Sequence, residues 1–263
     1  MSENNPITVQ SVWQALDQLA PPQLAAEWDT AIGLEIGRPD QLVSHVLIAL
    51  DVSEAVIDRA AASGCQLIIT HHPLIFTPLP AIRLDNPEQY LAAELLRCEI
   101  SLIAAHTNLD AAPGGVADCL ADAIGFPSHN RQAAGPFGRV GNLPEPRMLS
   151  QLALSAKKTL GSFGCRINTD QDRPVSRIAA FPGSFSEEEL PVLVELGVQA
   201  IICGEIKHHV TLMLAARGIA SIDAGHDVTE RVALHPLAVR LKEMMPEISF
   251  AVDVGLDYNK MAF

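Results

Sequence analysis

The stretch that decides the fold, HVLIALDVSEAVIDRAAASGCQLIITHH, occupies residues 45–72. Its two ends, 45–52 and 66–70, are short apolar runs typical of buried strands. Between them, residues 53–64 carry apolar side chains at helical spacing, with Ser53 as the N-cap and Gly64 as the C-terminal stop. A strand, a helix and a second strand in this order predict a βαβ unit, the building block of α/β proteins.

The alternation of strand and helix patterns continues on both sides of this unit. From Gly125 to Arg147 it is interrupted by a segment rich in Gly, Pro and polar residues, which predicts a crossing between domains. Helical spacing predicts helices over 8–20, 88–97, 116–124, about 148–160, 186–197 and about 207–217. Apolar runs predict strands over 100–105, about 163–169, 177–181, 199–203 and 219–224.

The two blocks of this α/β pattern resemble each other. Residues 53–70 and 186–203 share Ser, Glu, Gly, Gln and Ile-Ile at a constant offset, and 100–110 matches 219–230 in the same way. We therefore expect two similar, interleaved α/β lobes from a degenerate internal duplication: 1–125 plus about 220–263 as the first, and about 126–219 as the second. The alternative is a chance match, because helix–Gly–strand patterns recur in all α/β proteins.

Composition limits the classes of partner and the location. The 263 residues include 18 Lys and Arg against 31 Asp and Glu, a formal charge of −13, which disfavours nucleic acid and anionic membrane surfaces. The start of the chain lacks the pattern of a signal peptide, and no apolar run reaches the ~18 residues of a membrane span, so we expect a cytoplasmic protein. The five cysteines are widely spaced and predict reduced core thiols rather than disulfides.

Histidines and carboxylates follow the apolar runs at three places. His71 and His72 are adjacent, whereas His106 with Asp110 and His226 with Glu230 have the i, i+4 spacing that places both side chains on one helix face. Because ligands gather at the carboxyl ends of strands in α/β sheets, this convergence predicts a two-metal site. The predicted ligands are His71, His72, Asp110, His226 and Glu230. Taken by itself, each place could also be purely structural. His71 and His72 could form a strand end, Asp110 a turn, and His226 with Glu230 a solvated helical pair.

The chemistry of these donors limits the metal. Nitrogen and carboxylate ligands without thiolate suit Zn²⁺, Mn²⁺, Fe²⁺ or Ni²⁺ and do not favour Ca²⁺. Two ions would need a bridging carboxylate, which Glu230 or Asp110 could supply. Glu205, His208 and His209 follow the second-lobe strand at the place that matches His71 and His72, so we expect them to line or support the same cleft.

At these segments the sequence resembles the NIF-three-like family, whose members are often named GTP cyclohydrolase I type 2 homologs. The resemblance rests on five stretches in the family's order: ALDVSEAVIDRAAASGCQLIITHHPLIF (49–76), AAHTNLDAAPGGVADCLADAIG (104–125), GRVGNLPEP (138–146), CGEIKHH (203–209) and IDAGHDVTE (222–230). It departs at 28–34, which is one residue longer than the family's usual motif and lacks its Asn, and at 257–263.

The resemblance implies a dinuclear metal site on the five predicted ligands, with His106 as a neighbour suited to proton transfer. It also implies a ring-shaped homohexamer and a reaction like that of GTP cyclohydrolase, in which the imidazole ring of a nucleotide-like substrate is opened and formate leaves. The competing function class is a non-catalytic metal carrier, or a ring-shaped scaffold that presents surfaces to a partner.

Overall fold

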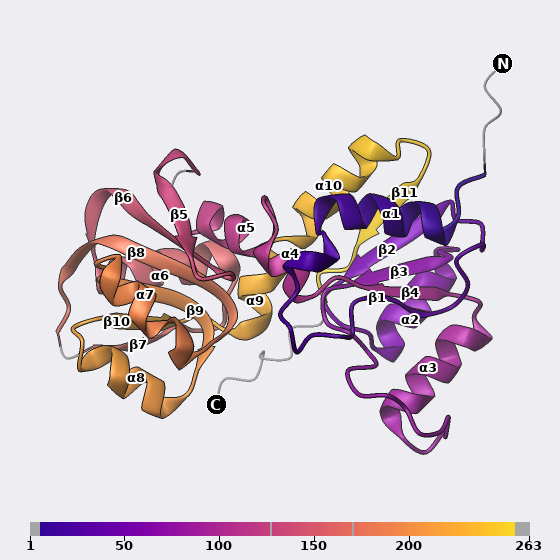
Figure 1. Cartoon of the computed structure of the whole chain (residues 1–263), viewed down its shortest axis with the longest axis horizontal. Helices are drawn as coiled ribbons and strands as arrows, with labels where there is room; N and C mark the ends of the chain where they lie inside the picture. Colours follow the sequence, from indigo (N-terminus) through magenta and orange to yellow (C-terminus); the bar gives the residue numbers. More distant parts are fainter. Residues whose placement is uncertain (1–5, 127, 170, 256–263) are drawn as a thin grey trace. The chain divides into compact units, whose positions relative to one another are not determined.

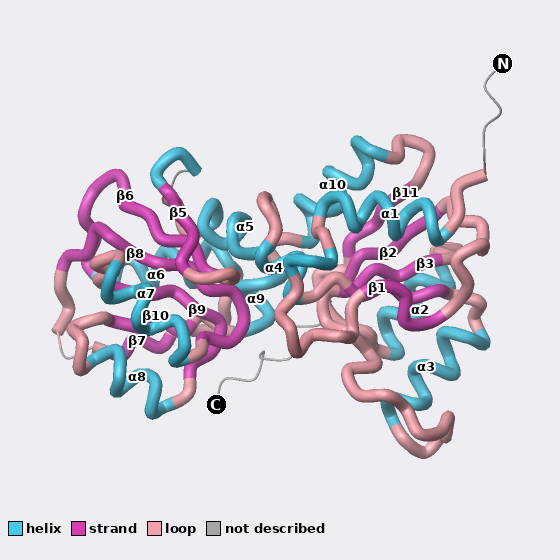
Figure 2. The backbone as a smooth tube through the Cα atoms, in the orientation of Figure 1, coloured by secondary structure: helices cyan, strands magenta, loops and turns pink. Residues whose placement is uncertain are grey.

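The computed structural model describes residues 6–126, 128–169 and 171–255, so the departure at 257–263 lies outside the described residues. The described chain divides into two compact units. Unit 1 holds the residues up to Ala112 and again from Leu234, and unit 2 holds Pro113–Ala233. Each unit is a β-sheet with helices against it, which confirms the α/β class (Figures 1 and 2).

The sheet of unit 1 has five strands in the order β1-β4-β3-β2-β11. The pairs β4–β3, β3–β2 and β2–β11 are parallel, and β1 is antiparallel to β4. The strands are β1 (Gly33–Ile36), β2 (His45–Ala49), β3 (Leu67–Thr70), β4 (Ser101–Ala104) and β11 (Ser249–Val252). The helices are α1 (Val9–Leu19), η1 (Pro22–Leu24), α2 (Glu54–Ala62), α3 (Pro87–Arg97), α4 (Thr107–Ala111) and α10 (Leu234–Met244). Helices α1 and α10 cover one face of this sheet, and α2 and α3 the other (Figure 1).

The predicted βαβ unit forms β2, α2 and β3. The Ser53 hydroxyl accepts a hydrogen bond from the backbone N–H of Val56, as expected of an N-cap, and Gly64 has φ +64° after the helix. All four residues of β3 are buried because helices cover both faces of the sheet. In the register between the strands, Ala49 pairs with Thr70, so β2 and β3 end side by side.

The sheet of unit 2 has six strands in the order β5-β6-β8-β9-β10-β7. The strands are β5 (Arg131–Ala134), β6 (Gly138–Met148), β7 (Arg166–Asn168), β8 (Pro174–Phe185), β9 (Ala200–Ile206) and β10 (Ala220–Asp223). The helices are α5 (Val116–Ala123), η2 (Ser128–Asn130), α6 (Leu149–Leu160), η3 (Glu187–Glu189), α7 (Leu190–Glu195), α8 (His208–Ala215) and α9 (His226–Arg231).

Two cores lie on opposite faces of this second sheet, because neighbouring strand residues point to opposite sides. Ile178 of β8 packs with Leu120 of α5 and Leu152 of α6 in one core. Phe181 of the same strand packs with Leu193 of α7 in the other.

The prediction that 125–147 is a crossing between domains is wrong, because the segment forms β5 and β6 at the edge of the second sheet. Two of the glycines that suggested a loop, Gly138 and Gly141, face aromatic rings. A Cβ at Gly138 would collide with the Phe181 ring, and one at Gly141 with the Phe126 ring. A glycine inside a strand permits this close approach.

The units also differ from the expected lobes at their boundaries. The first lobe was expected to contain about 220–263, but β10 pairs with β9 and β7, and α9 packs against β8 and β9, so β10 and α9 both belong to unit 2. Within each sheet, three parallel strands adjoin an antiparallel edge strand: β2-β3-β4 with β1, and β8-β9-β10 with β7. This shared arrangement agrees with an internal duplication.

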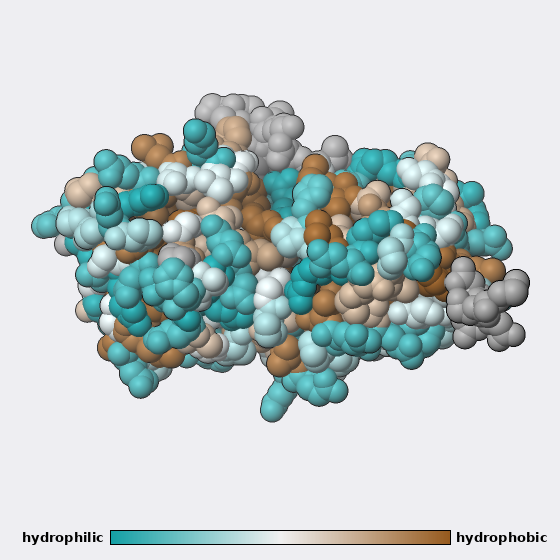
Figure 3. Space-filling view, turned by 90° about the horizontal axis from the view of Figure 1, so that it is seen from above, coloured by the Kyte–Doolittle hydropathy of each residue, from teal (hydrophilic) through white to brown (hydrophobic). Residues whose placement is uncertain are grey.

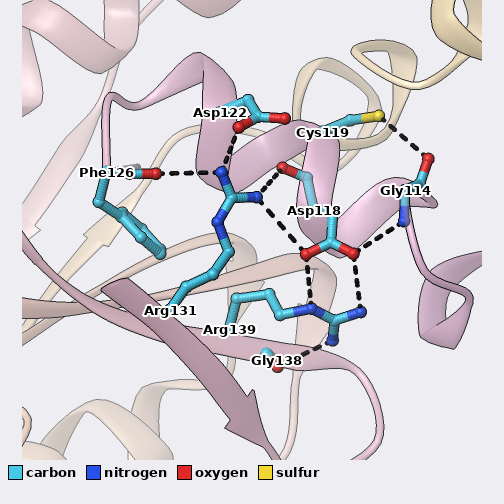
Figure 4. A network of polar contacts seen from close by, with 8 residues as sticks. All are labelled: Gly114, Asp118, Cys119, Asp122, Phe126, Arg131, Gly138 and Arg139. Atoms are coloured by element: carbon cyan, nitrogen blue, oxygen red, sulfur yellow. Dashed lines mark hydrogen bonds and ion pairs between the residues drawn. The ribbon is translucent and has the colours of Figure 1, made fainter. Parts of the chain in front are cut away.

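A charged network joins α5 to the edge strands within unit 2 (Figure 4). The Arg139 Nε donates to Oδ1 of Asp118 at 2.8 Å, and the backbone N–H of Gly114 donates to the other oxygen at 2.9 Å. Arg131 contacts both Asp118 and Asp122. Burial raises the pKa of Asp118, but these hydrogen bonds and the two guanidinium charges outweigh it, so the pKa lies below its ordinary value.

Hydrophobic side chains reach the surface at scattered places among polar ones, as the face in Figure 3 shows for each unit. The exposed large hydrophobic residues include Trp28 and Phe76, with 62% and 55% of their surface exposed. Among the described residues, no helix is long and apolar enough to cross a bilayer.

Candidate metal centre

Three histidines meet where two neighbouring strands of unit 1 end. His71 and His72 directly follow β3, and His106 follows β4, which pairs with β3. One ring nitrogen from each histidine lies within 4.8 Å of those of the other two. A parallel sheet thus brings together residues that are more than thirty positions apart in the chain, as the strand-end argument predicted.

His71 is the most buried of the three, with 2% of its side chain exposed. Its Nδ1 lies 3.0 Å from the carbonyl oxygen of Ala105, which can only accept, so the proton is on Nδ1 and the lone pair on Nε2. That Nε2 lies 3.6 Å from Oδ1 of Asp110, in the first turn of α4. A nitrogen lone pair and a carboxylate oxygen at this separation are two donors that one ion can join.

His72 has a carboxylate partner that the sequence pattern did not identify. Its Nδ1 lies 2.7 Å from Oδ1 of Asp51. A carboxylate on Nδ1 fixes the tautomer, leaves the lone pair on Nε2 and raises the basicity of that nitrogen. The register supplies a signal that could have found this pair: Ala49 pairs with Thr70, and Asp51 and His72 each lie two residues beyond.

His106 has a second such partner, the fully buried carboxylate of Asp29. Oδ2 of Asp29 lies 3.0 Å from Nδ1 of His106 and also accepts from the backbone N–H and the hydroxyl of Thr107, at 3.1 and 2.5 Å. These donors hold the carboxylate in one orientation toward the imidazole. Asp29 is far from His106 in sequence, and only its place in the 28–34 motif pointed to it.

Unit 2 places His226 and Glu230 together on α9, as their spacing predicted. Nε2 of His226 lies 3.0 Å from Oε1 of Glu230, whose side chain is 5% exposed. Nδ1 of the same imidazole lies 3.5 Å from Oε1 of Glu205 at the end of β9. Glu205 therefore supports His226, in line with the expectation, whereas His208 is exposed and His209 instead faces Glu187 at 3.7 Å.

Glycines make room for this pair. Gly183, near the end of β8, has φ +60°, and a Cβ there would collide with Oε1 of Glu230 and lie 3.2 Å from Nε2 of His226. Thr229 ties the same backbone to α9: its hydroxyl accepts from the N–H of Gly183 at 3.1 Å and donates to the carbonyl of His226 at 2.7 Å. Thr229 is fully buried, and no motif in the sequence distinguishes it.

The donors suit a divalent transition metal. Imidazole nitrogens backed by carboxylates, with Asp110 and Glu230 as oxygen donors, match the ligands of Zn²⁺, Mn²⁺, Fe²⁺ or Ni²⁺. Thiolate ligation has no such support. Burial raises the pKa of the thiols of Cys65 and Cys203, and both lie in hydrophobic cores.

The chain is similar to known proteins over most of its length. Residues 7–258 match the Duf34/NIF3 (NGG1p interacting factor 3) family. A protein of Lactococcus lactis named GTP cyclohydrolase 1 type 2 homolog is 33% identical over 217 residues, which cover 80% of this chain and 82% of the relative. One of the same name from Streptomyces coelicolor is 33% identical over 228 residues, which cover 82% and 79%.

Solved structures share the fold. The crystal structure of a Bacillus cereus protein related to NIF3 superposes with a TM-score of 0.89 at 23% identity and covers 99% of this chain and 100% of that one. A Staphylococcus aureus protein superposes with a TM-score of 0.88 at 25% identity, covering 98% and 100%. With the family match spanning nearly the whole sequence, this chain belongs to the Duf34/NIF3 family.

Proposed function

We propose that the protein is a dinuclear metal-dependent hydrolase that acts on a nucleotide-like heterocycle. The observation that carries the proposal is the histidine cluster of unit 1, in which each Nδ1 faces a carbonyl or carboxylate oxygen. Surface histidines need no such support, whereas metal ligands are commonly oriented in this way. The ligands in the proposal are the five that the sequence predicts: His71, His72, Asp110, His226 and Glu230.

Two divalent ions, when bound, would supply Lewis acidity, which lowers the pKa of water and polarises the attacked centre. The chain's own residues have separate tasks. Glu230 or Asp110 would hold both ions, and Asp51 and Glu205 orient His72 and His226. His106, oriented by the buried Asp29, accepts a proton from the attacking water and returns it to the leaving nitrogen.

The reaction class is supported by the names of the relatives, GTP cyclohydrolase 1 type 2 homolog. In hydrolysis of this kind, one water opens the imidazole ring of the base and a second releases the ring carbon as formate. We further infer a homohexameric ring in the cytoplasm, with Zn²⁺, Mn²⁺, Fe²⁺ or Ni²⁺ as the metal. Native mass spectrometry would give the subunit number, and elemental analysis the metal.

The decisive experiment measures formate release from GTP by protein of known metal content. We expect turnover that stops in His72→Ala and in metal-free protein and returns when metal is restored. Metal-loaded protein that is inert toward GTP and toward phosphoesters would instead favour a metal carrier or a scaffold.

The ligand assignment has a separate test. Glu230→Ala should lower the metal content from two ions per chain to one or none. The matched control is Glu195→Ala, which removes an exposed carboxylate at the end of α7 and should keep both ions. Full occupancy in Glu230→Ala would reject Glu230 as a ligand.

A further inference from the structure

Two exposed aromatic side chains stand beside the histidine cluster of unit 1. The Trp28 and Phe76 ring centroids are 6.2 Å apart, and each ring meets the imidazole of His106 edge-on, at 6.1 and 6.4 Å. These separations are those of interacting aromatic rings. More than half of each of the two aromatic side chains is nevertheless exposed. The function proposed above gives neither of them a role.

Both loops that carry these rings are anchored. Next to Trp28, Asp29 accepts two hydrogen bonds from Thr107, and the N–H of Ala26 donates to the Thr107 hydroxyl at 3.0 Å. The loop of Phe76 is held by Glu35 of β1, whose carboxylate accepts from the N–H groups of Leu74 and Ile75 at 3.0 and 2.8 Å. The backbone that carries the two exposed rings is therefore anchored on both sides, which favours a preorganised binding surface.

We infer that Trp28 and Phe76 form a subsite that stacks on the planar heteroaromatic ring of the substrate and holds it beside His106. The inference rests on the proposed function, because it states how the ring is presented to the site. Aromatic faces bind the plane of such a ring, and the imidazoles and carboxylates beside them are suited to its polar edge.

The exposed area favours a small ligand over a second protein chain. An aromatic side chain offers 150–250 Å² in all, so the exposed parts of Trp28 and Phe76 together amount to roughly 250 Å². A stable protein interface needs about 800 Å² from each partner. A fused bicyclic ring, by contrast, matches two side chains in size.

The chain suits a direct measurement, because Trp13 and Trp28 are its two tryptophans. In a Trp13→Phe background Trp28 is the single fluorophore, so its emission reports on the subsite. The probe is guanosine, added to metal-free protein so that no turnover occurs, with ribose 5-phosphate as the control without a base. We expect guanosine to quench Trp28, and ribose 5-phosphate to leave its emission unchanged.

Substitutions then test the contact by equilibrium dialysis in the native background. Trp28→Ala should weaken guanosine binding about tenfold, since base–aromatic stacking is of that order, and Trp28→Phe should restore most of it. Leu84→Ala, which removes another exposed hydrophobic side chain of unit 1, should have no effect. Thermal unfolding of each variant separates loss of the subsite from loss of the fold.

The outcomes separate this inference from the proposed hydrolase. Guanosine that neither quenches Trp28 nor binds less tightly to Trp28→Ala would overturn the subsite, even if GTP is turned over. Quenching without any formate release would keep the subsite and reject the hydrolase. A third outcome concerns a second copy of the chain. If acrylamide quenches Trp28 only in dilute protein, and sedimentation shows that the protein dissociates on dilution, then a second copy covers this surface. That result would also overturn the inference.

Discussion

Nδ1 of His72 lies 2.7 Å from Oδ1 of Asp51, at the ends of two paired parallel strands. If this carboxylate orients His72 for a metal, Asp51→Asn should weaken metal binding by about 10–100-fold, the usual effect of removing such a partner. Competition with a chromophoric chelator measures this affinity. Asp58→Asn, which removes an exposed carboxylate from α2, is the control for charge alone. Equal affinities in the two variants would contradict the orienting role.

Gly183→Ala should lose bound metal to an extent that its loss of folding stability does not explain. A Cβ at Gly183 collides with Glu230, while Gly197 has nearly the same φ, +65°, and nothing within 4 Å of its Cβ position. Both alanine variants carry the cost of a left-handed residue, about 1 kcal/mol. We therefore expect Gly197→Ala to keep its full metal content and Gly183→Ala to lose metal, measured by elemental analysis after dialysis. Retention of both ions in Gly183→Ala would show that Glu230 can move aside.

Thr229→Val should destabilise unit 2 by about 1–3 kcal/mol, because the buried N–H of Gly183 loses its acceptor while the side-chain volume stays nearly constant. Thr229→Ser keeps the hydroxyl and serves as the control. Urea unfolding of the two variants gives the difference. A valine variant as stable as the serine variant would mean that the Gly183 N–H finds another partner.

Asp118→Asn should lower the free energy of unfolding by about 1.5–3 kcal/mol at neutral pH, the range for hydrogen bonds to a charged group. Because the folded state holds the pKa of Asp118 below its ordinary value, the charged form stabilises the fold above that value. This contribution is lost as the pH falls through about 4 and below. Wild type and variant should therefore converge in acid, as followed by denaturation at several pH values.

The control for this pH dependence is Asp122→Asn. Asp122 contacts Arg131 but is 67% exposed, and exposed ion pairs contribute little. A stability difference between wild type and Asp118→Asn that stays constant with pH would reject the electrostatic account.

Short stretches of sequence correctly predicted the elements that depend only on neighbouring residues. The βαβ unit over 45–70 and the His226–Glu230 pair are examples, because an N-cap, a helical spacing and a buried strand are each visible within a few residues. The strand β11 was not predicted. Its pairing with β2 joins segments about two hundred residues apart, and a run of four residues carries no sign of such a partner.

The supporting carboxylates were missed for a related reason. Asp51 follows an apolar strand like many acidic residues, and its meaning appears only when β2 and β3 are aligned end to end. Asp29 contacts His106 across a separation that only the three-dimensional structure closes. Strands β5 and β6 were mistaken for a linker because Gly138 and Gly141 of β6 serve packing against Phe181 and Phe126, whereas in a sequence a glycine is read as a breaker of regular structure.

The two histidine–carboxylate spacings show what a repeated segment permits. His106 occupies the N-cap position of α4, and Asp110, four residues later, faces His71. His226 lies inside α9 and faces its own Glu230. The same spacing thus meets two different sets of neighbours. A carboxylate four residues after a histidine therefore does not by itself determine which imidazole it contacts; the surrounding backbone does.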